Sequence, residues 1–231
     1  MITYASAQRL GTRLHQCDAT ATATERGVRA WALLDGIGDR HDVRTWARRN
    51  ARLLAQVAAH TDNPLAAVAA VHTATGFDEY ANEPEPPDAV AVVAVRAENG
   101  PLRLAWRGDA RAYWWPWGES PLRKITTDHN MAQRFRERGI TNFPVHYRNQ
   151  VTSSLRHPNS DTGTETVHGR GRLVLCSDGV YSPFEDNGAW MGAPLATFEA
   201  RTAARDLVVR AVGLSADRTD NATAYVVDFR R

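Results

Sequence analysis

Five aspartates stand at the ends of segments whose composition predicts β-strands: Asp18, Asp35, Asp109, Asp178 and Asp220. A buried carboxylate is costly unless something pairs with it, and a metal ion is a common partner. Three of the five adjoin a glycine, which allows a main-chain carbonyl to approach and join the carboxylates. A donor set of oxygens, without His or Cys ligand spacing, favours Mg²⁺, Mn²⁺ or Ca²⁺. Taken singly, each Asp-Gly or Asp-Asn pair is more typical of a turn, so the hypothesis of a metal site rests on the set.

Strands and helices are predicted in separate stretches around these aspartates. The segments 18–24 and 28–34 flank a turn and predict a hairpin. An Asn-Gly pair predicts a second hairpin between 88–95 and 101–106. Further strands are expected at 111–115, 122–126, 172–176 and 221–229, helices at 42–60, from 64 onwards, at 129–139 and at 202–213, and a long irregular loop at 140–170. This grouping is typical of an α+β layered fold rather than of an alternating parallel sheet.

The overall composition is that of an ordinary globular chain. It has 231 residues and a formal net charge of +2, so we expect one domain and neither nucleic acid nor membrane as a partner. Two cysteines without a CxxC spacing predict neither a disulfide framework nor a zinc site. No signal peptide and no apolar stretch of membrane-spanning length is evident. The sequence predicts a soluble cytoplasmic protein, and its near-exclusive use of arginine over lysine suggests a bacterial, GC-rich gene.

Six sequence elements resemble, in order and over nearly the whole chain, those of the metal-dependent serine/threonine protein phosphatases of the PPM family (protein phosphatase type 2C). They are GTRLHQCDA, ALLDGIGD, RGDARAY, ITTDHNMAQRFRERGI, LVLCSDGV and TDNATAYVVDF. Each one alone is a weak or moderate motif, whereas six in the correct order form a specific pattern. The resemblance implies a single phosphatase domain of bacterial type over residues 1–231. It also implies an α+β fold, a four-layer α-β-β-α sandwich in which helices flank two antiparallel sheets.

The same resemblance implies a cofactor of two Mn²⁺ or Mg²⁺ ions, with a third ion in bacterial members. Carried over motif by motif, Asp35 bridges the two ions and the carbonyl of Gly36 binds one of them. Asp178 and Asp220 complete the first ion's ligands, and Asp109 helps to hold the third ion.

Two further residues receive roles from the resemblance. Asp18 lies in or next to the metal cluster and orients metal-bound water, and Arg13 holds the substrate phosphate, to which a planar guanidinium is well matched. The implied reaction is hydrolysis of phosphoserine and phosphothreonine on proteins by a hydroxide that bridges the metals. No protein nucleophile is needed, so Cys17 and Cys176 have no catalytic role. The implied protein is a cytoplasmic signalling enzyme and a monomer, with a phosphoprotein substrate from a serine/threonine kinase pathway.

Several positions depart from the family's pattern. Cys17 stands where an acidic residue is usual, Ile37 stands where some members carry a histidine proposed as general acid, and Asp39 replaces the last glycine of DGxGG. The usual Gly-Thr-Thr start of a strand is replaced by residues 87–90, and Ala110 replaces the serine of GDSR. None of these changes removes a predicted metal ligand, so the sequence favours an active enzyme.

Other functions fit this sequence less well. Gly36 and Gly38 follow a strand, as in a dinucleotide-binding turn, but His41 stands where the third glycine is needed. A phosphodiesterase on a similar carboxylate set conflicts with the order of the motifs. The main alternative is a catalytically weak or inactive phosphatase-like module that binds a phosphoprotein or a regulatory partner. The segment 140–170 resembles the family's variable flap beside the active site and is expected to decide the substrate.

Overall fold

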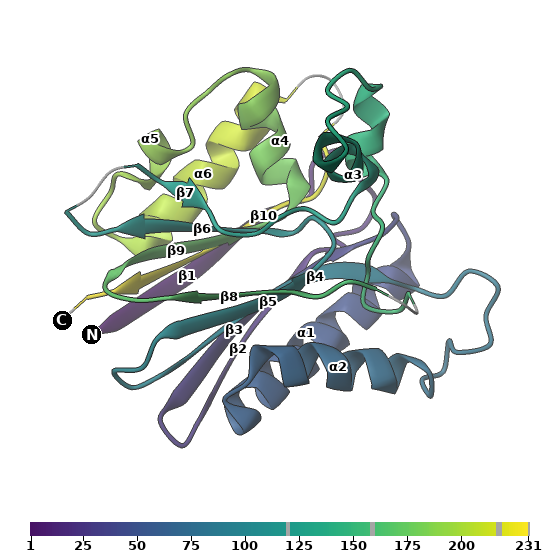
Figure 1. Cartoon of the computed structure of the whole chain (residues 1–231), viewed down its shortest axis with the longest axis horizontal. Helices are drawn as coiled ribbons and strands as arrows, with labels where there is room; N and C mark the ends of the chain where they lie inside the picture. Colours follow the sequence, from purple (N-terminus) through teal and green to yellow (C-terminus); the bar gives the residue numbers. More distant parts are fainter. Residues whose placement is uncertain (119–120, 158–159, 216–218, 231) are drawn as a thin grey trace.

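The structure is a computed structural model that describes residues 1–118, 121–157, 160–215 and 219–230 (Figure 1). Two five-stranded sheets lie face to face, and every pair of neighbouring strands is antiparallel. The first sheet has the order β1 (Ile2–Arg9), β10 (Ala222–Phe229), β9 (Gly171–Cys176), β6 (Arg111–Pro116) and β7 (Arg123–Lys124). The second has the order β2 (Ala19–Glu25), β3 (Val28–Gly36), β4 (Ala89–Ala97), β5 (Leu102–Arg107) and β8 (Gly163–Val167).

Helices cover the outer face of each sheet, which completes the four-layer α+β sandwich (Figure 1). The second sheet is covered by α1 (His41–Thr61) and α2 (Pro64–Thr75). The first sheet is covered by α4 (Asp178–Asp186), α5 (Gly192–Leu195) and α6 (Ala200–Leu214). A shorter helix, α3 (Met131–Glu137), and the 3₁₀ turn η1 (Val145–Asn149) lie at one end of the sandwich. The predicted fold class is therefore confirmed.

The alternation of side chains along the strands explains why continuous apolar runs are needed. On β3, Ala30, Ala32 and Leu34 face the core under α1 and α2, whereas Trp31 and Leu33 face the core between the sheets. Successive side chains of a strand point to opposite faces, so a strand covered on both faces must be apolar throughout. Strand β6 shows the same alternation: Trp114 packs between the sheets, whereas Tyr113 packs in the core under α4 and α6.

Helix boundaries follow the local capping chemistry that the sequence predicts. Asp62 ends α1 in the left-handed conformation, and the Asn63 side chain caps α2 by accepting hydrogen bonds from the backbone N–H groups of Leu65 and Ala66. Pro64 fills the first position of α2, where a missing N–H has no cost. Within the described ranges, none of the helices combines the length and apolarity that crossing a bilayer requires.

The prediction of one irregular loop over 140–170 is wrong in part. Strand β8 and the turn η1 both lie inside that segment. Strand β8 is the polar sequence GTETV at the edge of its sheet, and its backbone pairs with β5. Its side chains give no apolar signal because pairing, rather than burial, holds an edge strand in place. Strand β1 and helices α4 and α5 were also not predicted from the sequence.

Candidate metal centre

The register of the strands brings the five aspartates to one end of the sandwich. In the second sheet, Asp35 lies opposite Val90 at the end of β3, and Ala19, which follows Asp18, pairs with Leu34. In the first sheet, Cys176 pairs with Ala224, so the residues after β9 and before β10 lie at a common edge. These residues are Asp178 and Asp220. Asp109 lies in the connection that leads from β5 to β6 and thus from one sheet to the other.

Asp18 is held from several sides. The residue is 2% exposed, and its Oδ2 accepts a hydrogen bond of 2.8 Å from the hydroxyl of Ser177. The Gln8 side-chain amide donates to the Asp18 carbonyl at 3.2 Å, and the Asp18 N–H donates to the Gln16 side chain at 3.2 Å. Burial raises the pKa of Asp18 to about 7, despite the hydrogen bond from Ser177. Asp18 is therefore a fixed, buried carboxyl that can hold a proton near neutral pH.

The other inner carboxyls share this environment. Burial raises the pKa of Asp109 to about 7 and that of Asp178 to about 6. Burial and then repulsion from Asp18 and the remaining aspartates raise the pKa of Asp35 well above its usual range. Clustered like charges favour the neutral form of each carboxyl, and a bound cation reverses that preference. A cation bound at this end of the sandwich would therefore allow the carboxyls to ionise together.

The donor set fits a hard divalent cation, because it consists of carboxylate and backbone oxygens. In this conformation, the described part of the chain brings no three His, Cys, Asp or Glu side chains together closely enough to hold an ion. The fit therefore rests on the chemistry and burial of the donors. The predicted ligands Asp35, Gly36, Asp109, Asp178 and Asp220 all lie at this end of the sandwich, and their role as ligands stays a prediction.

Two of the glycines in these motifs are required by close backbone contacts. A Cβ atom on Gly179 would lie 2.1 Å from the carbonyl oxygen of Asn221, and one on Gly36 would lie 2.7 Å from the carbonyl oxygen of Cys17. The loops that carry the aspartates thus pack backbone against backbone. This is the close approach that the sequence predicted for Asp-Gly pairs.

We expect Gly179→Ala to destabilise the protein by about 1–3 kcal/mol, because the backbone at Asn221 must move to admit the methyl group. Gly213→Ala in α6 is the matched control, since nothing lies within 4 Å of a Cβ atom at that position. It should stabilise the protein by about 0.5–1 kcal/mol through helix propensity. Urea unfolding checks both values, and equal effects of the two substitutions would contradict the backbone contact.

Arg13 lies at the rim of the centre and pairs with Asp220. Its Nη2 is 2.6 Å from Asp220 Oδ2, and both side chains are 39% exposed. The loop that carries Arg13 is fixed at Thr12, whose N–H and hydroxyl both donate to the carbonyl of Thr219. The hydrogen bond and the charge of Asp220 raise the pKa of Arg13. The structure thus pairs two predicted site residues that the resemblance assigns to different ligands, one to the substrate phosphate and one to a metal.

Asp39, one of the departures from the family pattern, supports the same loop. It accepts hydrogen bonds from the backbone N–H groups of Leu14 at 2.9 Å and His15 at 2.7 Å. These donors, the Leu14 N–H first, lower the pKa of Asp39. The departure therefore replaces a glycine with a carboxylate that holds the segment next to Arg13. Sequence reasoning did not find this role, because the contact joins residues 25 positions apart.

Other supporting residues were also missed. Asn221 accepts a hydrogen bond from the Cys17 N–H at 2.7 Å and donates to the Leu10 carbonyl at 2.8 Å, so it joins the mouth of β10 to the loop before β2. Ser177 reaches Asp18 across 159 positions of the chain. Both residues adjoin a predicted metal ligand in the SDG and DN elements. Their polarity inside those motifs was the available signal.

Arg111 holds the segment that follows Asp109. Its guanidinium pairs with both oxygens of Asp128, at 2.9 and 2.7 Å, and with Glu185 at 2.5 Å. The guanidinium carbon also lies 3.5 Å from the centre of the Tyr181 ring. A buried cation with these partners links β6, the loop before α3 and helix α4. It thereby fixes the position of Asp109 relative to the first sheet.

Solved structures that match the whole chain are PPM-type serine/threonine phosphatases, and the chain has their fold. The catalytic domain of PstP, solved with two manganese ions, is 21% identical with a TM-score of 0.70, over 100% of this chain and 99% of that chain. MsPP from Mycobacterium smegmatis, a PPM Ser-Thr phosphatase solved with cacodylate, is 20% identical with a TM-score of 0.74, over 99% and 98%. PppA of Pseudomonas aeruginosa, described as a key regulatory component of T6SS, is 20% identical with a TM-score of 0.75, over 99% and 98%.

No protein-family model and no curated protein matches the sequence. The solved structures confirm, at the level of the fold, the family resemblance inferred from the six motifs. The roles of the individual site residues remain predictions.

Proposed function

We propose that this chain is a metal-dependent phosphatase that hydrolyses phosphoserine and phosphothreonine on proteins. The observation that carries the proposal is the convergence of five aspartates at one end of a PPM-type sandwich, with Arg13 at the rim. In addition, the solved structure of PstP, which has the same fold, contains two manganese ions. Divalent cations bound by Asp35, Gly36, Asp109, Asp178 and Asp220 would supply Lewis-acid activation of water and neutralise the phosphate.

The residues of the chain have separate tasks in this proposal. Arg13 binds two phosphate oxygens with its planar guanidinium and so fixes the phosphorus next to the carboxylates. Asp18 is oriented by its hydrogen bond from Ser177, so that its carboxylate can accept a hydrogen bond from water at the centre. Neither buried cysteine is required. Burial raises the pKa of the Cys176 thiol above its usual range, so it is a poor nucleophile.

The direct test is phosphate release from a phosphothreonine peptide and from p-nitrophenyl phosphate. Turnover with Mn²⁺ or Mg²⁺ that EDTA abolishes would support the proposal. A folded protein that releases no phosphate with either metal would overturn it.

We expect Arg13→Ala to raise KM for the phosphothreonine peptide by about 10-fold or more, because a charge-assisted contact to phosphate is lost. Arg13→Lys should recover only part of this loss, since a lysine cannot bind two oxygens in a fork. The matched control is Arg9→Ala, an exposed arginine at the end of β1. Steady-state kinetics check the prediction, and an unchanged KM in Arg13→Ala would remove Arg13 from the phosphate site.

A second candidate function is a phosphoprotein-binding module without turnover. Two observations favour it: Arg13 is engaged by Asp220, and among the described residues no three carboxylates lie close enough together in this conformation to hold an ion. This candidate predicts binding of a phosphothreonine peptide with no phosphate release at any metal concentration. Calorimetry and phosphate release on one preparation distinguish the two functions.

A further inference from the structure

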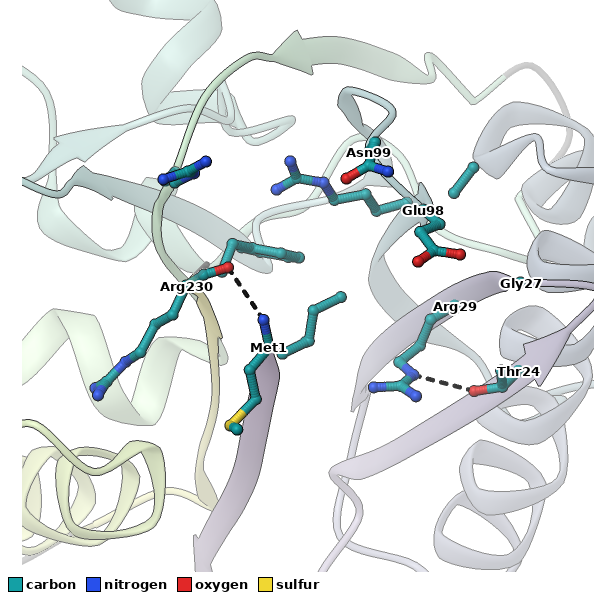
Figure 2. Close-up of a pocket in the computed structure, with 12 residues that line it drawn as sticks. Met1, Thr24, Gly27, Arg29, Glu98, Asn99 and Arg230 are labelled. Atoms are coloured by element: carbon teal, nitrogen blue, oxygen red, sulfur yellow. Dashed lines mark hydrogen bonds between the residues drawn. The ribbon is translucent and has the colours of Figure 1, made fainter.

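A charged cavity lies at the end of the sandwich away from the five aspartates, where Met1 and Arg230 approach the turn between β4 and β5 (Figures 1 and 2). Its volume is about 530 Å³, within the range of small-molecule sites. Figure 2 shows that its labelled residues come from both sheets, with Arg29 and Thr24 on one side and Met1 and Arg230 on the other. The cavity therefore lies between the two sheets.

Arginines dominate the charge of this cavity. The lining includes four of them, Arg29, Arg96, Arg170 and Arg230, and one acid, Glu98. Arg230 is already paired with Asp228, at 3.1 Å. Among the described residues, the other three arginines form no ion pair. The ammonium group of Met1, which donates to the Arg230 carbonyl, also lines the cavity, so its lining carries more positive than negative charge.

Arg96 has a buried hydrogen-bond donor, its Nη1, that lacks a partner among the described residues. Its guanidinium carbon lies 4.6 Å from the centre of the Phe229 ring, which also lines the cavity. Burial, followed by the nearby charge of Arg170, lowers the pKa of Arg96. A buried donor without a partner is costly, and an anion bound between Arg96 and Arg170 would satisfy it.

Arg29 extends the positive surface from the other sheet. Its Nε donates to the hydroxyl of Thr24 at 3.1 Å, and its guanidinium carbon lies 5.4 Å from the centre of the Tyr4 ring. These contacts orient the group without neutralising it. The remaining N–H donors of Arg29 are thus available to a ligand that enters from the solvent.

This cavity is distinct from the carboxylate centre. Arg29 and Asp35 both lie on β3, six residues apart, which corresponds to about 20 Å along a strand. A ligand held by Arg96 and Arg170 therefore does not reach the five aspartates.

We propose that the cavity lined by Arg29, Arg96 and Arg170 is a binding site for a small molecule that carries a phosphate dianion. The two negative charges of the ligand suit the positive excess of the lining, and guanidinium forks match phosphate oxygens better than other cations do. The volume exceeds that of one phosphate, so the cavity also accepts an organic body attached to it. The site is separate from the proposed phosphatase centre and does not depend on turnover.

The test is isothermal titration calorimetry on the full chain supplemented with Mn²⁺, with inorganic phosphate, AMP and acetate as the three probes. Each probe is titrated into the wild type, into Arg170→Gln, into Arg96→Gln combined with Arg170→Gln, and into the control Arg201→Gln, an exposed arginine on α6. A parallel set carries Arg13→Gln, which weakens phosphate only at the carboxylate end. Arg170 is exposed, so Arg170→Gln retains the fold even if the double variant does not.

The expected result is a phosphate and AMP site that persists in Arg13→Gln, is weakened at least about 10-fold in the Arg96/Arg170 double variant, and changes less than about two-fold in Arg201→Gln. AMP binding tighter than phosphate assigns the organic body to the cavity, and equal affinities assign the site to the free anion. Acetate binding as tightly as phosphate would overturn the proposal, because a monoanion would then suffice. Unchanged phosphate affinity in the folded Arg170→Gln and double variants would overturn it as well.

Discussion

Asp178→Asn is expected to abolish metal-dependent phosphate release and, in the metal-free protein, to raise the free energy of unfolding. The cation needs this carboxylate as a ligand, so its loss lowers turnover. In the metal-free protein the ionised carboxylate destabilises the fold, so its loss raises the free energy of unfolding. The loss of one metal ligand removes several kcal/mol of transition-state stabilisation, so we expect turnover to fall by about 10³-fold or more.

The gain in stability follows from the pKa of Asp178, which burial and repulsion from Asp220 raise to about 6. Because this value lies above that of the unfolded chain, the folded protein binds the proton more tightly, and ionisation destabilises the fold as pH rises between about 4 and 6. The asparagine cannot ionise. The gain in the free energy of unfolding of Asp178→Asn over the wild type should be absent below about pH 4 and reach about 1–2 kcal/mol above about pH 7. The gain is this small because the carboxylate is partly exposed to solvent.

The control for both measurements is Asp186→Asn at the other end of the same helix, where the aspartate is exposed and pairs with Arg148. It should leave turnover unchanged and the unfolding free energy within about 0.5 kcal/mol. Phosphate release with Mn²⁺ and urea unfolding in EDTA at two pH values give the comparison. Turnover within about 10-fold of the wild type in Asp178→Asn would exclude this residue as a metal ligand.

Arg172→Met is expected to have the largest effect on stability, with a loss of about 3–5 kcal/mol. Arg172 and Asp228 are both fully buried, and two hydrogen bonds of 2.6 and 2.8 Å join the guanidinium to the carboxylate. Arg172 also donates to the carbonyl of Leu195 in α5. Among the residues that the structure describes, the substitution leaves the Asp228 carboxylate with the more exposed Arg230 as its one ionic partner.

Replacement of both partners, Arg172→Met with Asp228→Leu, should recover most of the loss, because no uncompensated charge then remains. The matched control is Arg205→Met, which removes an exposed pair with Asp206 on α6 and should cost less than about 1 kcal/mol. Urea unfolding of the wild type, of the single variants Arg172→Met and Asp228→Leu and of the double variant forms a double-mutant cycle, with Arg205→Met measured beside it. A double variant less stable than either single variant would show that packing, rather than the unpaired charge, causes the loss.

The parts of the fold that sequence could predict are those that local chemistry determines. The apolar run of β4, the Asn-Gly turn after it and the Asp-Asn-Pro boundary between α1 and α2 each carry their signal within a few residues. Strand β8 carries no such signal, because the backbone of β5 rather than its own side chains holds it. Helix α4 begins at a predicted metal ligand and contains Pro183, so its sequence resembles a turn.

The candidate site shows the same division. The acids could be found because each one follows or precedes a strand and three adjoin a glycine. The contacts that support them could not, because they join distant positions: Arg13 reaches Asp220 across 207 residues and Ser177 reaches Asp18 across 159. The arginine cavity at the other end has no sequence signal at all, since its residues come from separate turns and strand ends.

The most direct test of the central claim is a crystal structure of the protein with Mn²⁺, with anomalous diffraction recorded at the manganese edge. The account predicts manganese peaks between Asp35, the Gly36 carbonyl and Asp178, and their disappearance in Asp178→Asn crystals grown under the same conditions. Crystals of an active protein with no manganese peak among these residues would contradict the metal centre.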